Sequence, residues 1–169
     1  MTERLPVVVS VNGRGVELLV EPRATLADLL RDECACLSVH LGCEQGACGA
    51  CTVLVDGEQA RACLVLGVQA NGADVVTLEG LAPPAGWHVL QEAFRDAHSF
   101  QCGFCTPGFV LAAYAFLAER PDADEREIRE ALSGNLCRCT GYQSIVAGVV
   151  LARDRLDGRA LPAPGRALS

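Results

Sequence analysis

The sequence predicts an α+β protein whose two parts follow one another along the chain. β-rich runs around Asn-Gly and Asp-Gly turns dominate the first 80 residues, and apolar residues at helical spacing dominate from residue 87 onward. Between them, the stretch LAPPAG interrupts both patterns with two prolines and a glycine. We therefore expect a β-rich domain over residues 1–80, a linker over residues 81–86, an all-α domain over residues 87–156 and a tail over residues 157–169.

Local signals place the elements of the first domain. Asn-Gly and Asp-Gly pairs favour the tight turns of β-hairpins, and both pairs lie between runs of high β propensity. Thr25 precedes an apolar stripe and has Asp28 three residues on, which is typical of a helix N-cap. The expected elements are a hairpin over residues 7–11 and 16–20, the helix capped by Thr25, a second hairpin over residues 52–55 and 59–65, and a strand over residues 75–78.

Helical periodicity predicts four helices in the second domain. Proline is tolerated at the first helical position, so Pro107 can open one helix, and Asp124 can cap another. Residues 107–119 are apolar almost all round, which favours a place in the middle of a bundle. The expected helices cover residues 88–97, 107–119, 124–132 and 141–154, and the tail after them has no periodic pattern.

Composition and charge exclude several classes of function. The chain has 14 basic and 21 acidic residues, a formal charge of -7, and no basic patch, so we expect no nucleic-acid partner. The longest apolar run, residues 109–117, is too short to span a bilayer, and residues 1–10 lack the basic and apolar regions of a secretion signal. We therefore expect a cytoplasmic protein with no membrane span.

Ten cysteines require an explanation of their own, because thiols in a reducing compartment stay reduced unless a metal or a catalytic step uses them. They form an N-terminal group of six and a C-terminal group of four, separated by a long stretch without cysteine, which indicates two sites. The positions are Cys34, Cys36, Cys43, Cys48, Cys51, Cys63, Cys102, Cys105, Cys137 and Cys139.

The first group contains a metal-binding pattern. Cys43, Cys48 and Cys51 have the spacing C-x4-C-x2-C, and Cys63 follows after 11 residues, which matches the plant-type arrangement for a 2Fe-2S cluster. Interleaved glycines let the backbone wrap closely and direct N–H groups at the cluster sulfurs. Zinc is the alternative, but zinc ribbons usually carry two C-x2-C knuckles, so this spacing favours a cluster.

The second group consists of Cys102 and Cys105, in a C-x2-C pattern, and Cys137 and Cys139, in a C-x-C pattern. Each pair comes just before the expected start of a helix. If both helices direct their N-termini at one site, their free N–H groups would stabilise a negatively charged cluster there. We therefore expect a second cluster, as a hypothesis from sequence position.

Three stretches resemble the iron-sulfur small subunit of the molybdenum hydroxylase (xanthine oxidase) family of bacterial carbon monoxide, aldehyde and N-heterocycle dehydrogenases: GCEQGACGACTVLVDG, QCGFCTPG and GNLCRCTGY. The resemblance covers about residues 5–155. It implies a β-grasp ferredoxin-like 2Fe-2S domain followed by an all-α four-helix 2Fe-2S domain. The implied ligands are Cys43, Cys48, Cys51 and Cys63 for the first cluster and Cys102, Cys105, Cys137 and Cys139 for the second.

The resemblance also implies partners. In the family, a large subunit holds a molybdopterin cofactor as a dinucleotide and oxidises the substrate, and a medium subunit often holds FAD; the three chains assemble as a dimer of heterotrimers. Gln101 matches the family glutamine whose amide reaches the pterin of the large subunit. The second cluster would then lie nearer molybdenum and the first nearer FAD or another acceptor. The chain shows no nucleophile, general base or substrate pocket, so the implied role is electron transfer without catalysis.

Two other readings stay open. A free-standing ferredoxin-like electron carrier would need neither a second domain nor Gln101, and a zinc-bound interaction module would be colourless. Cys34 and Cys36 have no ligand role in the family, so we expect structural thiols, with a reactive thiol as the alternative. We expect His40 and His88 to be surface or capping residues.

Overall fold

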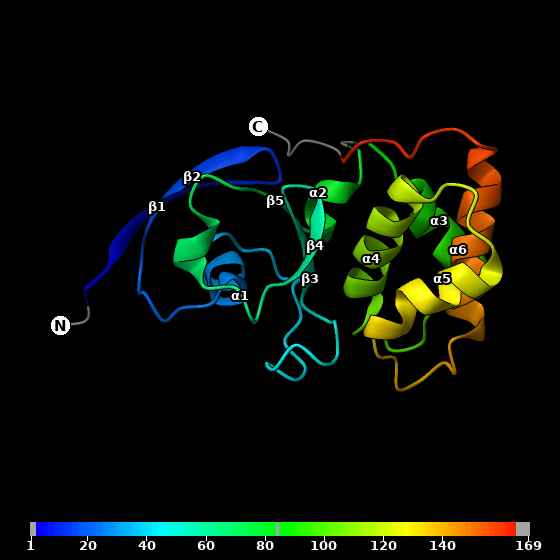
Figure 1. The fold of residues 1–169 in the computed structure, drawn as a ribbon, viewed down its shortest axis with the longest axis horizontal. Coiled ribbons are helices and arrows are strands. Elements are labelled where there is room, and N and C mark those ends of the chain that lie inside the picture. Colours follow the sequence, from blue (N-terminus) through cyan, green and yellow to red (C-terminus); the bar gives the residue numbers. More distant parts are fainter. Residues whose placement is uncertain (1–2, 84, 165–169) are drawn as a thin grey trace.

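The fold is described by a computed structural model over residues 3–83 and 85–164. Pro84 of the expected linker and residues 165–169 of the expected tail lie outside the described residues. Figure 1 shows a sheet with a short helix on one side and a group of longer helices on the other. The α+β class is confirmed, with the strands in the N-terminal half and the longer helices in the C-terminal half.

A five-stranded sheet with the order β2-β1-β5-β3-β4 organises the N-terminal half of the described chain. β1 and β5 are parallel, and the other neighbours are antiparallel. The Asn12-Gly13 turn joins the first two strands, and both of its residues have positive φ (53° and 78°), as the tight hairpin turn requires. The strands are β1 Leu5–Val11, β2 Arg14–Val20, β3 Thr52–Val55, β4 Glu58–Arg61 and β5 Asp74–Val76.

A short helix covers one face of this sheet. α1 (Leu26–Asp28) continues as a π-helical turn over Leu29–Glu33. The predicted cap is confirmed: Thr25 accepts a hydrogen bond from the Asp28 backbone N–H, and the Asp28 carboxylate accepts one from Thr25 in return. Leu26 and Leu30 are fully buried against the alternating inward side chains of β1.

The predicted C-terminal ends of two strands are wrong. β4 stops at Arg61 instead of residue 65, because its partner strand begins at Thr52, which pairs with Arg61, so residues beyond it have no neighbour to pair with. β5 stops at Val76, since the chain turns at Thr77 into α2 (Leu78–Leu81), a short helix that the sequence did not predict. A 3-10 turn over Gly67–Ala70 occupies part of the connection between β4 and β5.

The longer helices follow the predicted order. Asp124 caps its helix with a capping box, as predicted, and His88 caps another, accepting a hydrogen bond from the Leu90 N–H. The last helix begins two residues later than expected, because Tyr142 adopts a left-handed conformation (φ 72°). The helices are α3 Val89–Asp96, α4 Thr106–Glu119, α5 Glu125–Ala131, which continues as a 3-10 turn over Leu132–Gly134, and α6 Gln143–Leu156.

The helical core extends onto the sheet. α4 is buried on most of its surface, as its apolar sequence predicts, and it packs against β3 and β4 (Figure 1). Leu54 of β3 and Val76 of β5 belong to the same apolar cluster as the helices, because alternate strand residues point to the face opposite α1. The sheet therefore separates two cores and joins the two halves of the molecule.

The described part of the tail runs back from α6 along the helices (Figure 1). Leu161 packs on the helical core, and the Pro162 carbonyl lies 3.3 Å from Nε2 of the buried His88. Within residues 3–83 and 85–164, no helix has the length and apolar character needed to cross a membrane.

Candidate metal centres

The loop that carries the first three cysteines of the C-x4-C-x2-C pattern precedes β3. Gly46 and Gly49 have φ of 79° and 73°, which glycine adopts without strain, so the loop can curl its N–H groups inward. The Cys48 N–H donates to Cys43 Sγ at 3.3 Å. Hydrogen bonds from the backbone N–H groups of Gln45 and Cys48 lower the pKa of the Cys43 thiol to about 7, so this loop favours a thiolate.

The fourth cysteine of the first set comes from the segment after β4. Cys51 and Cys63 are both buried, and their side chains are within hydrogen-bonding reach of each other. Burial raises the pKa of the Cys51 thiol to about 11, which means that metal binding here would release a proton. The first set therefore meets as two pairs, Cys43 with Cys48 and Cys51 with Cys63.

The second set also meets as two pairs. Cys102 and Cys139 are exposed, and their Sγ atoms lie 3.6 Å apart. Cys105 and Cys137 are within hydrogen-bonding reach of each other, and burial raises the pKa of the Cys105 thiol to about 12. Cys105 directly precedes α4, as predicted, so the N-terminus of that 14-residue helix lies next to the site.

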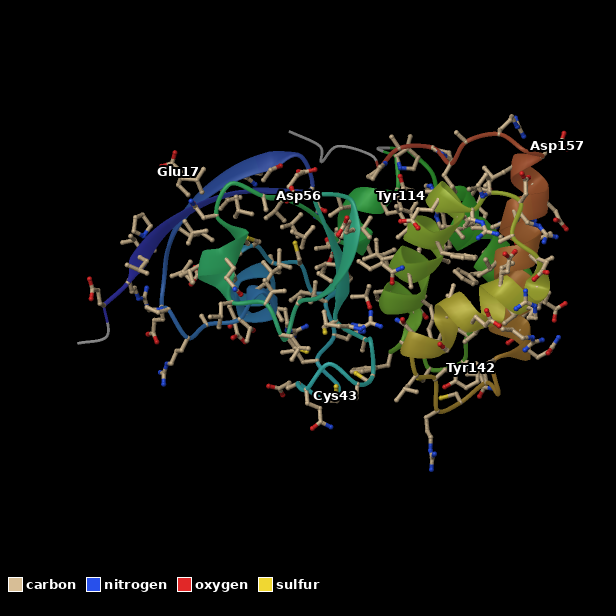
Figure 2. All side chains as sticks on the ribbon, viewed as in Figure 1. Glu17, Cys43, Asp56, Tyr114, Tyr142 and Asp157 are labelled. Carbon is tan, nitrogen blue, oxygen red and sulfur yellow. The ribbon has the colours of Figure 1, made fainter. Side chains whose placement is uncertain are left out.

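Hydrogen bonds shape the loop that carries Cys137. Burial alone would raise the pKa of this thiol, but the Thr140 hydroxyl, 3.2 Å from Sγ, and nearby backbone N–H groups lower it instead. The Tyr142 hydroxyl accepts a hydrogen bond of 2.9 Å from the Cys137 N–H, so its side chain folds back over the loop. Figure 2 shows Tyr142 and Cys43 along the same edge of the molecule.

The two sets of cysteines are neighbours in space. A cavity of about 460 Å³ is lined by all four cysteines of the second set and also by Cys48 of the first. The Leu136 N–H, next to Cys137 in the chain, donates to the Cys48 carbonyl at 2.8 Å. Backbone of one site therefore contacts backbone of the other directly.

The donor set fits binuclear iron-sulfur clusters. Each of the two irons of a 2Fe-2S cluster takes two protein ligands, so four thiols in two pairs match its needs, whereas a structural zinc gathers four ligands around one ion. Backbone N–H groups at Cys43 supply the hydrogen bonds that cluster sulfurs need. The ligand assignment itself stays a prediction.

Three further candidate residues are Gln101, Cys34 and Cys36. Gln101 is exposed at the rim of the second site, and its Nε2 donates to the Cys139 carbonyl at 3.1 Å. Cys36 is buried and accepts a hydrogen bond from Asn12, and burial raises the pKa of both Cys34 and Cys36, which favours the structural role over a reactive thiol.

The sequence did not predict the contacts between the loops that carry the two sets of cysteines. His40 stacks on Phe104 with ring centroids 4.8 Å apart, and its Nδ1–H donates to the Phe104 carbonyl at 2.7 Å. Arg61 bonds to the Gly134 carbonyl, and Asn135 bonds to the Gly49 carbonyl. These pairs are more than 60 residues apart in the chain, so no local pattern could have indicated them.

Comparison with known families defines the class of protein. The family described as "2Fe-2S iron-sulfur cluster binding domain" matches residues 9–73, and the family described as "2Fe-2S binding domain" matches residues 77–150. The chain is thus an iron-sulfur protein with two 2Fe-2S-binding domains in tandem.

Its relatives narrow this class. The gamma subunit of caffeine dehydrogenase from Pseudomonas sp. (strain CBB1) is 50% identical over 143 residues, covering 83% of this chain and 86% of the relative. The small subunit of nicotine 6-hydroxylase from Paenarthrobacter nicotinovorans is 46% identical over 158 residues, covering 94% and 95%. A chain of quinoline 2-oxidoreductase from Pseudomonas putida 86 superimposes with a TM-score of 0.88 at 42% identity, covering 94% of this chain and 99% of that chain. The chain belongs to the family of iron-sulfur small subunits of molybdenum hydroxylases, as its motifs predicted.

Proposed function

We propose that this chain is the electron-transfer subunit of a molybdenum-containing hydroxylase. It takes electrons from a molybdopterin dinucleotide in a large subunit and passes them through two 2Fe-2S clusters to FAD in a medium subunit, or to another acceptor. The observation that carries this proposal is the contact between the two cysteine sets: Cys48 of the first set lines the cavity of the second. Two clusters in contacting loops form a relay, which a single-site carrier does not need.

The ligands of this proposal are the eight cysteines of the two sets. Cys43, Cys48, Cys51 and Cys63 hold the first cluster, and Cys102, Cys105, Cys137 and Cys139 hold the second. In each cluster the observed pairs suggest which two thiolates share an iron. Bound in this way, each cluster accepts and returns one electron at a time.

Exposure supports the proposed direction of electron flow. In the second site Cys102 and Cys139 are exposed, and Gln101 stands beside them, whereas Cys51 and Cys63 of the first site are buried. The second site is therefore the one that a large subunit can approach closely, with the Gln101 amide in reach of its pterin. Phe104 and Leu136, apolar side chains that are 46% and 53% exposed, lie at the same cavity and would be covered by that subunit.

The assembly and the domain bounds are part of the same proposal. We propose a β-grasp domain over residues 1–80, a linker over residues 81–86, a four-helix domain over residues 87–156 and a tail over residues 157–169, acting in a cytoplasmic dimer of heterotrimers. The two separate apolar cores support the division into domains. The extension of the helical core onto β3 and β5 supports a fixed arrangement of the two domains.

The first test is iron and acid-labile sulfide analysis with low-temperature EPR of the dithionite-reduced protein, isolated together with the chains that co-purify. We expect about four irons per chain and two distinct 2Fe-2S signals. Cys105→Ser is expected to remove one signal and about two irons, whereas the matched control Cys34→Ser keeps both. Zinc without sulfide would support the interaction module instead, and a stable monomer that its neighbours do not need would support the free-standing carrier.

A further inference from the structure

Arg61, the last residue of β4, joins the two cysteine loops. Its Nη1 donates to the Thr52 hydroxyl in the neighbouring strand, and its Nη2 donates to the Gly134 carbonyl at 2.7 Å and to Asn135 Oδ1 at 3.3 Å. Thr52 directly follows Cys51, and Asn135 lies two residues before Cys137. One guanidinium therefore holds the end of one cysteine loop against the start of the other.

The partners of Arg61 form a buried polar cluster. Asn135 is 2% exposed and Thr52 is 1% exposed. The Asn135 amide donates to the Gly49 carbonyl at 3.0 Å, and the Thr52 hydroxyl donates to the same carbonyl at 2.6 Å. Buried polar groups cost free energy unless they are hydrogen-bonded, so this cluster is stable only when the loop with Gly49 and the loop with Asn135 lie in their observed relative positions.

The backbones come close at this cluster. A Cβ added at Gly49 would lie 2.7 Å from Asn135 Nδ2 and 2.8 Å from the Gly134 carbonyl oxygen, so only glycine permits the approach. The Leu136 N–H to Cys48 carbonyl hydrogen bond lies next to this contact, one residue earlier in the first loop and one residue later in the second. The spacing between the two cysteine sets is thus set by direct contact rather than by the linker.

Among the described residues, no carboxylate pairs with the charge of Arg61. Over the described ranges, 3–83 and 85–164, its hydrogen-bond acceptors are two oxygens of neutral side chains and one backbone carbonyl, and no ion pair includes it. Arginines on the helices, such as Arg126 and Arg129, pair with glutamates instead. A fixed, half-buried positive charge therefore lies at the junction of two cysteine-rich sites.

We propose that Arg61 is a positioning residue for electron transfer between the two clusters. Its guanidinium fixes the distance between them, and its unpaired charge raises the reduction potential of the first cluster relative to the second. This inference rests on the proposed function. Since reduction adds one negative charge to a cluster, a nearby fixed cation favours the reduced state. We expect the larger effect on the first cluster, because two of its proposed ligands, Cys51 and Cys63, flank the Thr52–Arg61 pair, whereas Arg61 reaches the second set only through Gly134 and Asn135, before Cys137.

The test uses the assembled complex and three variants. Arg61→Gln removes the charge, Arg61→Lys keeps the charge but loses the planar fork, and Arg126→Gln is the control, because it makes the same charge change on an exposed helix face. Iron content and far-UV circular dichroism first establish that each variant is folded and loaded. EPR-monitored redox titration then gives the reduction equilibrium of each cluster, and the magnetic splitting between the two reduced clusters reports their separation.

The expected results separate the two effects. Arg61→Gln should make reduction of the first cluster roughly tenfold less favourable, about 59 mV for one electron, and alter the splitting. Arg61→Lys should keep most of the reduction potential of the unmodified complex but show an altered splitting. Arg126→Gln should change neither quantity. If fully loaded Arg61→Gln protein keeps the potentials and the splitting of the unmodified complex, Arg61 has no positioning role. If the unmodified complex itself shows fewer than two clusters, the proposed function fails before Arg61 is tested.

Discussion

Gly108, in the first turn of α4, gives the sharpest test of how the two halves pack. In a helix, alanine is ordinarily more stable than glycine by about 1 kcal/mol, so local propensity predicts that Gly108→Ala stabilises the protein. In the structure, a Cβ at this position would lie 2.2 Å from the Gly49 carbonyl oxygen and 3.0 Å from Asn135 Nδ2. We expect the opposite sign, because the atom in the way belongs to the backbone of the first cysteine loop and cannot rotate aside.

The magnitude follows from these two opposing effects. Forcing an extra methyl group into a packed interior costs about 1–3 kcal/mol, and more when backbone must move. Because the atom in the way belongs to the backbone, the upper part of this range, about 2–3 kcal/mol, applies, so after the gain in helix propensity Gly108→Ala should lose about 1–2 kcal/mol of stability. For a chain of this size that loss lowers the apparent melting midpoint by about 2–8 °C.

The assay is thermal unfolding of the iron-loaded protein, followed by circular dichroism and by loss of the cluster absorbance at one fixed protein concentration. Gly15→Ala is the matched control, because a Cβ at Gly15 would meet no atom within 4 Å and its φ is not positive. The control should unfold near the unmodified midpoint. A Gly108→Ala protein that melts at or above the unmodified midpoint would refute the close approach of α4 to the first loop.

Two further predictions concern groups outside the cluster ligands. Burial lowers the pKa of His88, whose Nδ1 accepts a hydrogen bond from the Leu90 N–H, so the unfolded chain protonates this imidazole more readily than the folded chain. The free energy of unfolding should therefore fall as the pH drops below about 6.5. Urea titrations at several pH values should show a weaker pH dependence for His88→Gln. Cys34→Ala and Cys36→Ala should both keep about four irons per chain. Cys36→Ala should lower the melting midpoint more, because Cys36 is buried and receives the Asn12 hydrogen bond; loss of iron in either variant would contradict their structural role.

Local chemistry was predictable where a few neighbouring residues decide it. Thr25 and Asp124 cap their helices because each cap is formed within four residues, and the Asn12-Gly13 turn follows from the same kind of local geometry. The end of β4 was not predictable, since a strand ends where its partner ends, and the start of β3 is fixed by the cysteine loop before it. α2 was missed because four residues carry too little periodic signal.

The candidate sites divide in the same way. The eight candidate ligand cysteines could be selected from the sequence, the first set by its spacing and the second by the family resemblance, although the second set pairs across residues 37 positions apart. The sequence by itself therefore determined two cysteine-rich sites, the capped helices and the α+β class. Only the tertiary structure decided how the two sites are arranged relative to each other. The Arg61–Gly134 and Asn135–Gly49 contacts join residues 73 and 86 positions apart, and α4 approaches the first cysteine loop through Gly108, so the relation between the two sites depends on packing that no local pattern encodes.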